Sequence, residues 1–135
     1  MIRLIKPADE RAVRSLQSLL TYADPQLVDA ALDGPFVGRV AVHEGRVVGY
    51  AVGLPGEETT LSELVVAPEH RRLGYGRALV EAVADASAAD RLVVTTPVEN
   101  EAAERFYRAM GFEISERVSG FYADGTDALR LARGE

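Results

Sequence analysis

The chain has 135 residues, a formal net charge of −6 and 47% hydrophobic residues, which fits one globular domain with a sizeable core. The lack of cysteine excludes disulfides, thiolate metal sites and a cysteine nucleophile. The acidic balance argues against a nucleic-acid partner, which needs a clustered basic face, and no apolar run approaches the roughly 18 residues of a membrane span. We therefore expect a single domain over residues 1–135, cytoplasmic, with neither a nucleic-acid nor a membrane partner.

The first half of the chain predicts a strand, two helices and a hairpin. A Glu44-Gly45 turn joins the two strands of the hairpin. The longer helix has apolar residues at the spacing of one buried helical face, namely Ala12, Val13, Leu16, Leu19 and Leu20. The expected ranges are 2–7 for the strand, 9–22 and 25–32 for the helices, and 38–44 and 46–54 for the hairpin. A turn at 55–58 then leads into the next strand.

That strand, at 59–67, runs into a basic turn that contains glycine, and a helix at 75–88 follows. The N–H groups of a first helical turn have no partner inside the helix, and the helix dipole adds positive potential there. Glycines at 74 and 76 remove side chains that would keep phosphate oxygens away from those groups. The pattern therefore favours a pyrophosphate site, and the alternative is an ordinary strand-to-helix turn with solvated arginines.

The spacing of this turn excludes two familiar phosphate loops. A dinucleotide-binding fingerprint needs a small residue where Leu79 stands, and a Walker A loop needs a lysine, whereas the chain's only lysine is Lys6. The remaining pattern, Arg71-x-x-Gly74-x-Gly76, resembles the coenzyme A pyrophosphate loop of the GCN5-related N-acetyltransferases (GNAT).

A second pattern follows after a strand at 91–96. Asn100 is placed to cap a helix at 101–110, which ends at a glycine suited to a left-handed cap. The order Asn100, Ala103, Phe106-Tyr107, Gly111-Phe112 is similar to the second cofactor-binding motif of the same superfamily. Core packing would explain either motif alone, but both together, in this order and spacing, favour the GNAT superfamily.

The C-terminal segment predicts strands at 113–120 and 126–132, joined by a turn at Asp124-Gly125. The Phe121-Tyr122 pair before the turn and Asp127-Ala128 after it resemble the C-terminal hairpin of N-terminal (Nα) protein acetyltransferases. The resemblance covers residues 46–131 well and the first third of the chain only loosely.

The resemblance implies an α/β fold with a mixed, mostly antiparallel sheet that is splayed between strands 4 and 5 and flanked by about four helices. It also implies acetyl-CoA as the acetyl donor, and no metal. The residues that match the coenzyme site are Val65, Val66 and Ala67 on the strand, Arg71, Arg72, Leu73, Gly74, Tyr75, Gly76 and Arg77 in the turn, and Asn100, Ala103 and Phe106 near the later helix.

The catalytic residues implied by the resemblance are Tyr107 and Glu63. Tyr107 matches the tyrosine that protonates the leaving thiolate, and its alternative is a core aromatic. Several relatives carry a glutamate base where Thr95 stands, so Glu63 is the nearest carboxylate to act as base or water relay; its alternative is a polar edge residue. A backbone N–H near Val65 would hold the oxyanion.

The acceptor is expected to be the α-amino group of a protein or peptide N-terminus, with Phe121 and Tyr122 at the acceptor entrance and further contacts in residues 20–37. The α-amine, with a pKa of about 8, loses its proton far more readily than lysine at about 10.4. Two alternatives are a small-molecule amine, such as a polyamine, amino acid or antibiotic, and a coenzyme A-binding module without turnover. A homodimer is left open.

Overall fold

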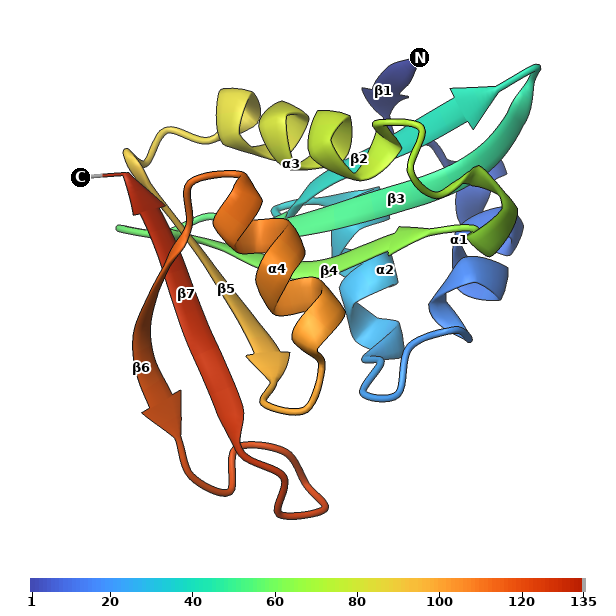
Figure 1. The fold of residues 1–135 in the computed structure, drawn as a ribbon. Helices are drawn as coiled ribbons and strands as arrows, with labels where there is room; N and C mark the ends of the chain where they lie inside the picture. The colour runs from blue at the N-terminus through green and yellow to red at the C-terminus, as the bar shows by residue number, and fades with distance from the viewer. Residues whose placement is uncertain (135) are drawn as a thin grey trace.

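The computed structural model describes residues 1–134, which form one seven-stranded sheet flanked by helices (Figure 1). The strands lie in the order β1-β2-β3-β4-β5-β7-β6. The elements are β1 (Ile2–Leu4), η1 (Pro7–Asp9), α1 (Glu10–Gln17), α2 (Pro25–Asp33), β2 (Val37–His43), β3 (Arg46–Leu54), β4 (Thr59–Val66), η2 (Pro68–His70), α3 (Tyr75–Ala86), β5 (Arg91–Pro97), α4 (Glu101–Ala109), β6 (Glu113–Val118) and β7 (Ala128–Gly134).

The sheet is antiparallel except between β4 and β5, and those two strands separate along their length (Figure 1). They pair in parallel only from Thr59 opposite Leu92 to Leu61 opposite Val94. Beyond that point, β5 continues with β7 as its partner while β4 continues with β3. The expected mixed sheet with a splay between strands 4 and 5 is therefore confirmed, together with the four α-helices.

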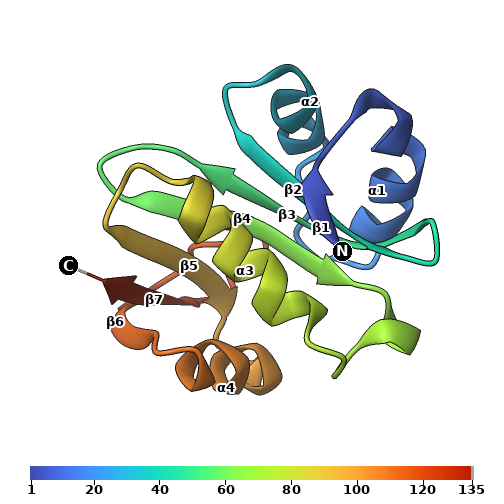
Figure 2. The same ribbon diagram turned by 90° about the horizontal axis from the view of Figure 1, so that it is seen from above.

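Two layers of helices cover the sheet, one on each face (Figure 2). The apolar stripes of α3 and α4 pack on one face, in a core that includes Leu61, Leu79, Val83, Tyr107 and Phe112. The stripes of α1 and α2 pack on the other face, in a core that includes Val13, Val28, Val40, Tyr50 and Val65. Strand β4 contributes to both cores. The alternation of its side chains between the two faces of the sheet therefore decides which of them pack under α3 and α4 and which pack under α1 and α2.

A bulge at Ser62 changes that alternation within β4. Leu61 pairs with Gly53 and Glu63 pairs with Val52, which leaves Ser62 as an extra residue. A bulge shifts the side chains that follow it to the opposite face. Leu61 therefore packs under α3, whereas Glu63 is directed to the α1 and α2 layer, where its carboxylate meets side chains of that core.

The largest difference from expectation lies in the first helix, which was expected over 9–22. A 3-10 turn precedes α1, and the helix ends at Gln17. Leu19, assigned to the buried stripe, is half exposed, so the expected stripe is too long. The first strand also ends earlier than predicted, at Leu4. Pro7, which has no N–H to offer a neighbouring strand, follows soon after.

None of the helices between residues 1 and 134 has the length and apolar character needed to cross a membrane.

Candidate active site

A cavity of about 570 Å³ lies where β4 and β5 separate. Its walls come from the loop between α1 and α2, from β4 and β5, from the inner face of α4, and from the loop between β6 and β7. Among the predicted site residues, Glu63, Asn100, Ala103, Tyr107, Phe121 and Tyr122 line it. The structure thus brings both predicted catalytic residues and both predicted acceptor residues to one cavity.

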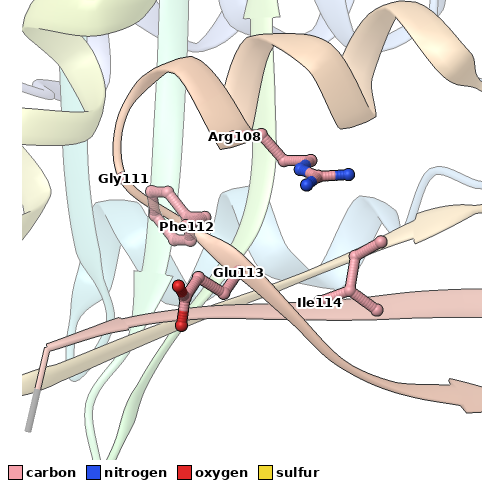
Figure 3. Close-up of a pocket in the computed structure, with 5 residues that line it drawn as sticks. All are labelled: Arg108, Gly111, Phe112, Glu113 and Ile114. Carbon is pink, nitrogen blue, oxygen red and sulfur yellow. The ribbon is translucent and has the colours of Figure 1, made fainter.

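Another hollow, of about 480 Å³, lies at the junction of α4 and β6 (Figure 3). It is lined by Arg108, Gly111, Phe112, Glu113 and Ile114. None of these residues belongs to the predicted catalytic, coenzyme or acceptor sets. The cavity at the splay is therefore the candidate active site.

Tyr107 lies on the inner face of α4 and is 6% exposed. Its ring packs edge-on against Phe106 and Phe112, with centroids 5.1 and 5.4 Å away. Burial raises the pKa of Tyr107 above its usual value, so the phenol is neutral throughout the physiological range. The side chain both packs in the core and lines the cavity, a position from which a proton donor would reach a bound thioester; this role stays a prediction.

Glu63 is buried, at 5% exposed, and its carboxylate is surrounded by donors. Oε1 accepts hydrogen bonds from the Tyr50 hydroxyl and from Nε2 of Gln17, each at 2.9 Å. Oε2 accepts from the backbone N–H of Asp24 at 3.1 Å and from Gln17 Nε2 at 3.2 Å. Gln17 and Tyr50, the partners that hold this carboxylate, were not identified from the sequence.

The predicted coenzyme strand, residues 65–67, comprises the last two residues of β4, beyond its pairing with β5, and Ala67, which follows the strand. On the opposite edge, this segment continues to pair with β3, and the N–H of Ala67 donates to the carbonyl of Val48 at 2.8 Å. Within residues 1–134 no strand pairs with β4 on the β5 side past Leu61. This edge has the backbone geometry that an extended, amide-bearing ligand would need to bind as an added strand.

The predicted phosphate turn leads directly into α3. Gly74 is the N-cap of this helix and has a φ of +88°, a conformation that L side chains rarely adopt. The surrounding residues Arg72, Leu73 and Arg77 are exposed, and Nε of Arg71 donates to the carbonyl of Val66 at 3.0 Å. A helix N-terminus approached by a left-handed glycine and flanked by exposed arginines fits a pyrophosphate.

Gly76 lies in the first turn of α3, where it has a packing role in addition to its predicted place in the phosphate turn. A Cβ on Gly76 would lie 3.2 Å from Cζ of Phe106, so the missing side chain allows α3 to pack closely against α4. The structure therefore gives Gly76 a packing reason, whereas a Cβ on Gly74 would meet no atom within 4 Å.

Two loops meet over the cavity through a pair of tyrosines. The ring of Tyr22, from the α1–α2 loop, stacks on Tyr122 with centroids 4.0 Å apart. The Tyr22 hydroxyl also donates to Oδ2 of Asp124 at 2.7 Å and lies 3.2 Å from the hydroxyl of Thr126. We call the contact between these loops the tyrosine bridge. Tyr22 was not singled out from the sequence, although it lies within the segment expected to contact the acceptor.

Hydrogen bonds and burial set the protonation states of the groups in the tyrosine bridge. The backbone N–H of Thr126 and the Tyr22 hydroxyl hold the pKa of Asp124 below its usual value, so this carboxylate stays ionised. Burial, followed by the charges of Tyr22 and Glu99, raises the pKa of Tyr122 to about 12. The pKa of Tyr22 is raised as well, so both phenols are neutral at physiological pH. Across residues 1–134, no group of three or more potential metal ligands comes together.

Comparison with known proteins agrees with the geometry. The profile of the acetyltransferase (GNAT) family matches residues 5–112. N-alpha-acetyltransferase 30 of Schizosaccharomyces pombe is 33% identical over 115 residues, covering 78% of this chain and 70% of the yeast protein. Mycothiol acetyltransferase of Clavibacter michiganensis is 32% identical over 103 residues, covering 76% of this chain but only 33% of its own length. Among solved structures, Ard1 from Thermoplasma volcanium superimposes with a TM-score of 0.85 at 26% identity, covering 99% of this chain and 96% of that protein.

Proposed function

Because the chain belongs to the acetyltransferase (GNAT) family, we propose that it transfers the acetyl group of acetyl-CoA to the α-amino group of a protein or peptide N-terminus. The observation that carries this choice of acceptor is the tyrosine bridge, which joins the α1–α2 and β6–β7 loops over the cavity. A bridge of this kind at the cavity would favour an acceptor that enters end-on. A chain terminus fits that entry, whereas a lysine side chain on a folded surface would have to bring its flanking backbone past the bridge.

The proton that the amine must lose supports the same acceptor. An α-amino group has a pKa of about 8 and a lysine side chain about 10.4, a difference worth roughly 3.3 kcal/mol of deprotonation. Several members of the family carry a glutamate base on β5 at the position that is Thr95 in this chain. Thr95 lines the cavity but has no carboxylate. A site without a strong base at that position is better matched to an amine that is partly deprotonated at neutral pH.

Acetyl-CoA would be held along the outer edge of β4 and at the start of α3. The β4 backbone at 65–67 would pair with the amides of the pantetheine arm, and the N–H groups after Gly74 would bind the pyrophosphate. Asn100 accepts a hydrogen bond from the Ala103 N–H at 3.1 Å and so fixes the start of α4 beside the cavity. These contacts would orient the donor before the amine arrives.

Acetyl-CoA supplies the thioester carbonyl carbon that the amine attacks, and the chain's own groups stabilise the charges that follow. A backbone N–H near Val65 would donate to the carbonyl oxygen as it becomes negative. Tyr107 would donate its proton to the departing sulfur as the carbon–sulfur bond breaks. The free amine loses one proton to water as the amide bond forms, and Tyr107 regains its proton from water, so charge and protons balance.

A second acceptor class, the small-molecule amine, has its own support. The cavity is lined by the carboxylate residues Glu63 and Asp24, which favour a cationic amine, and a mycothiol acetyltransferase is among the relatives. The third reading, a coenzyme A-binding module without turnover, is favoured only by the threonine at position 95. The presence of Tyr107 in the cavity counts against it.

The test is release of free thiol from acetyl-CoA with three sets of acceptors. The first set has peptides with a free N-terminus, the second has the same peptides N-blocked but containing lysine, and the third has small amines. We expect kcat/KM to be highest on the first set. Preference for the second set would refute the proposal, activity only on the third would support the small-molecule alternative, and no thiol release with any set would support the binding module.

A further inference from the structure

The carboxylate of Glu63 accepts hydrogen bonds from three neighbouring groups. A carboxylate offers about four lone-pair sites, and here three donors occupy most of them: the Tyr50 hydroxyl, the Asp24 N–H and one N–H of Gln17 that is shared between both oxygens. The Tyr50 ring is 0% exposed, and burial together with the charge of Glu63 keeps its hydroxyl protonated, because both raise its pKa. Tyr50 is therefore a constant donor. A general base, in contrast, needs a lone pair directed at the acceptor amine.

The same contacts hold the loop between α1 and α2, residues 18–24, which we call the acceptor loop. Its last residue, Asp24, is tied at both backbone groups: its N–H donates to Glu63, and its carbonyl accepts from Gln17 Nε2 at 3.0 Å. The Asp24 side chain caps α2 by accepting from the N–H of Gln26 at 3.0 Å. Asp24 thereby joins the loop to three elements: α1 through Gln17, β4 through Glu63 and α2 through the Gln26 N–H.

The acceptor loop forms one wall of the active-site cavity. Leu19, Leu20, Thr21, Tyr22 and Asp24 all line it. Tyr22 lies two residues before Asp24, so the position of Asp24 limits where the Tyr22 ring meets Tyr122 in the tyrosine bridge. The bulge at Ser62 is what directs Glu63 toward this loop and away from the α3 layer. The arrangement places a buried charge where it can set the geometry of acceptor binding.

We propose that Gln17, Tyr50 and Glu63 form a clamp on the acceptor loop, and that Glu63 is a positioning residue which acts through this clamp rather than as the general base. The inference rests on the proposed function only in taking a peptide as the acceptor. Proton removal from the amine then falls to solvent, which suits an α-amine with a pKa of about 8.

Two roles for Glu63 give different kinetics. As a clamp, Glu63→Gln should raise KM for the acceptor about tenfold, leave kcat within about threefold, and leave the acid limb of the pH profile in place. As a base, the same variant should lower kcat by about 10²–10⁴-fold and remove that limb. Tyr50→Phe and Gln17→Leu keep the Glu63 carboxylate but remove its donors, so under the clamp they should also raise KM.

A second readout reports on the loop itself. Because the Asp24 N–H donates to Glu63, its hydrogen exchange, followed by NMR, should be slow in the wild type and about tenfold faster or more in Glu63→Gln and Gln17→Leu. Glu116→Gln is the matched control, since Glu116 is an exposed glutamate on β6, outside the cavity lining. That variant should change neither the KM nor the Asp24 exchange rate.

The outcomes separate this inference from the proposed function. A kcat loss above about 100-fold in Glu63→Gln, with the acid limb lost and Asp24 still protected, would overturn the clamp. If the wild type acetylates only small amines, the peptide proposal fails, but the exchange rates and the KM for those amines still decide on the clamp. Tyr50→Phe and Glu63→Gln nearly preserve side-chain volume, so they decide the question if Gln17→Leu does not fold.

Discussion

Replacing Tyr107 with phenylalanine removes one hydroxyl from the active-site cavity and nothing from the core. A tyrosine at its usual pKa of about 10 is a weaker acid than a thiol at about 8.5, so complete proton transfer to a thiolate is uphill by about 2 kcal/mol. Burial raises the pKa of Tyr107 further, which widens this gap. We therefore expect Tyr107 to act late, as the sulfur leaves, and its loss to be at the low end for a general acid, about 10²-fold in kcat.

The assay is steady-state thiol release together with calorimetric binding of acetyl-CoA and a thermal melt. The rings around position 107 are unchanged in the variant, so we expect coenzyme affinity and melting temperature close to the wild type. Because the pKa of Tyr107 is raised, its deprotonation should add no alkaline limb to the wild-type kcat profile up to about pH 10. A variant with normal kcat in the folded fraction, or with lost stability as its only defect, would refute the assignment and leave Tyr107 a core aromatic.

Two further predictions concern the glycines and an ion pair. Gly74→Val should weaken acetyl-CoA binding at least tenfold by straining the helix N-cap. Gly76→Val should instead lower the free energy of unfolding by about 1–3 kcal/mol through its clash with Phe106. Calorimetry and urea denaturation of both variants would show the difference, and a wild-type coenzyme affinity in Gly74→Val would contradict the first prediction. Asp9, 6% exposed, accepts two hydrogen bonds from Arg3, which hold its pKa below the usual value. A lowered pKa in the folded state stabilises the protein at pH values above the unfolded pKa of about 3.9, and this stabilisation is lost as the pH falls through the folded pKa. Asp9→Asn should therefore lower the free energy of unfolding by about 2 kcal/mol at pH 7 and by progressively less below about pH 4. A pH-independent difference would contradict the second prediction.

Local sequence patterns located most of the elements that build the site. The strand at 59–67, the glycine-bearing turn and the helix starting at 75 lie within a residue or two of their predicted bounds, because each has a local signal: an apolar run, a left-handed glycine or a helical stripe. Asn100 caps α4 as expected from its side-chain oxygen. The separation of β4 from β5 follows from the family resemblance and is confirmed by the pairing.

The orientation of Glu63 has no local signal. Leu61, Glu63 and Val65 read as alternate residues of one strand face, but the extra residue at Ser62 sends Leu61 to one core and Val65 to the other. A serine between two such residues does not mark a bulge. The partners of Glu63 could not be named from the sequence for the same reason.

The tyrosine bridge was also beyond local patterns. Tyr22 and Tyr122 are separated by most of the chain, and only the folded sheet brings their loops together. The end of α1 has a related cause, since helical propensity continues through Leu19 and Leu20 while the loop that follows is tied by Gln17 to Asp24. Gln17 also donates to Glu63 on β4, and such tertiary contacts override the local helical preference.

The early end of the β4–β5 pairing at Leu61 and Val94 affects the solubility and stability of the protein as well as its catalysis. A strand edge with unpaired backbone groups is a template on which another chain can add, and proteins usually protect such edges from aggregation. The ligand that would occupy this edge would also stabilise the folded state, by about 2.7 kcal/mol when present at 100 times its dissociation constant. Acetyl-CoA bound at this edge would in that way also protect the chain from self-association.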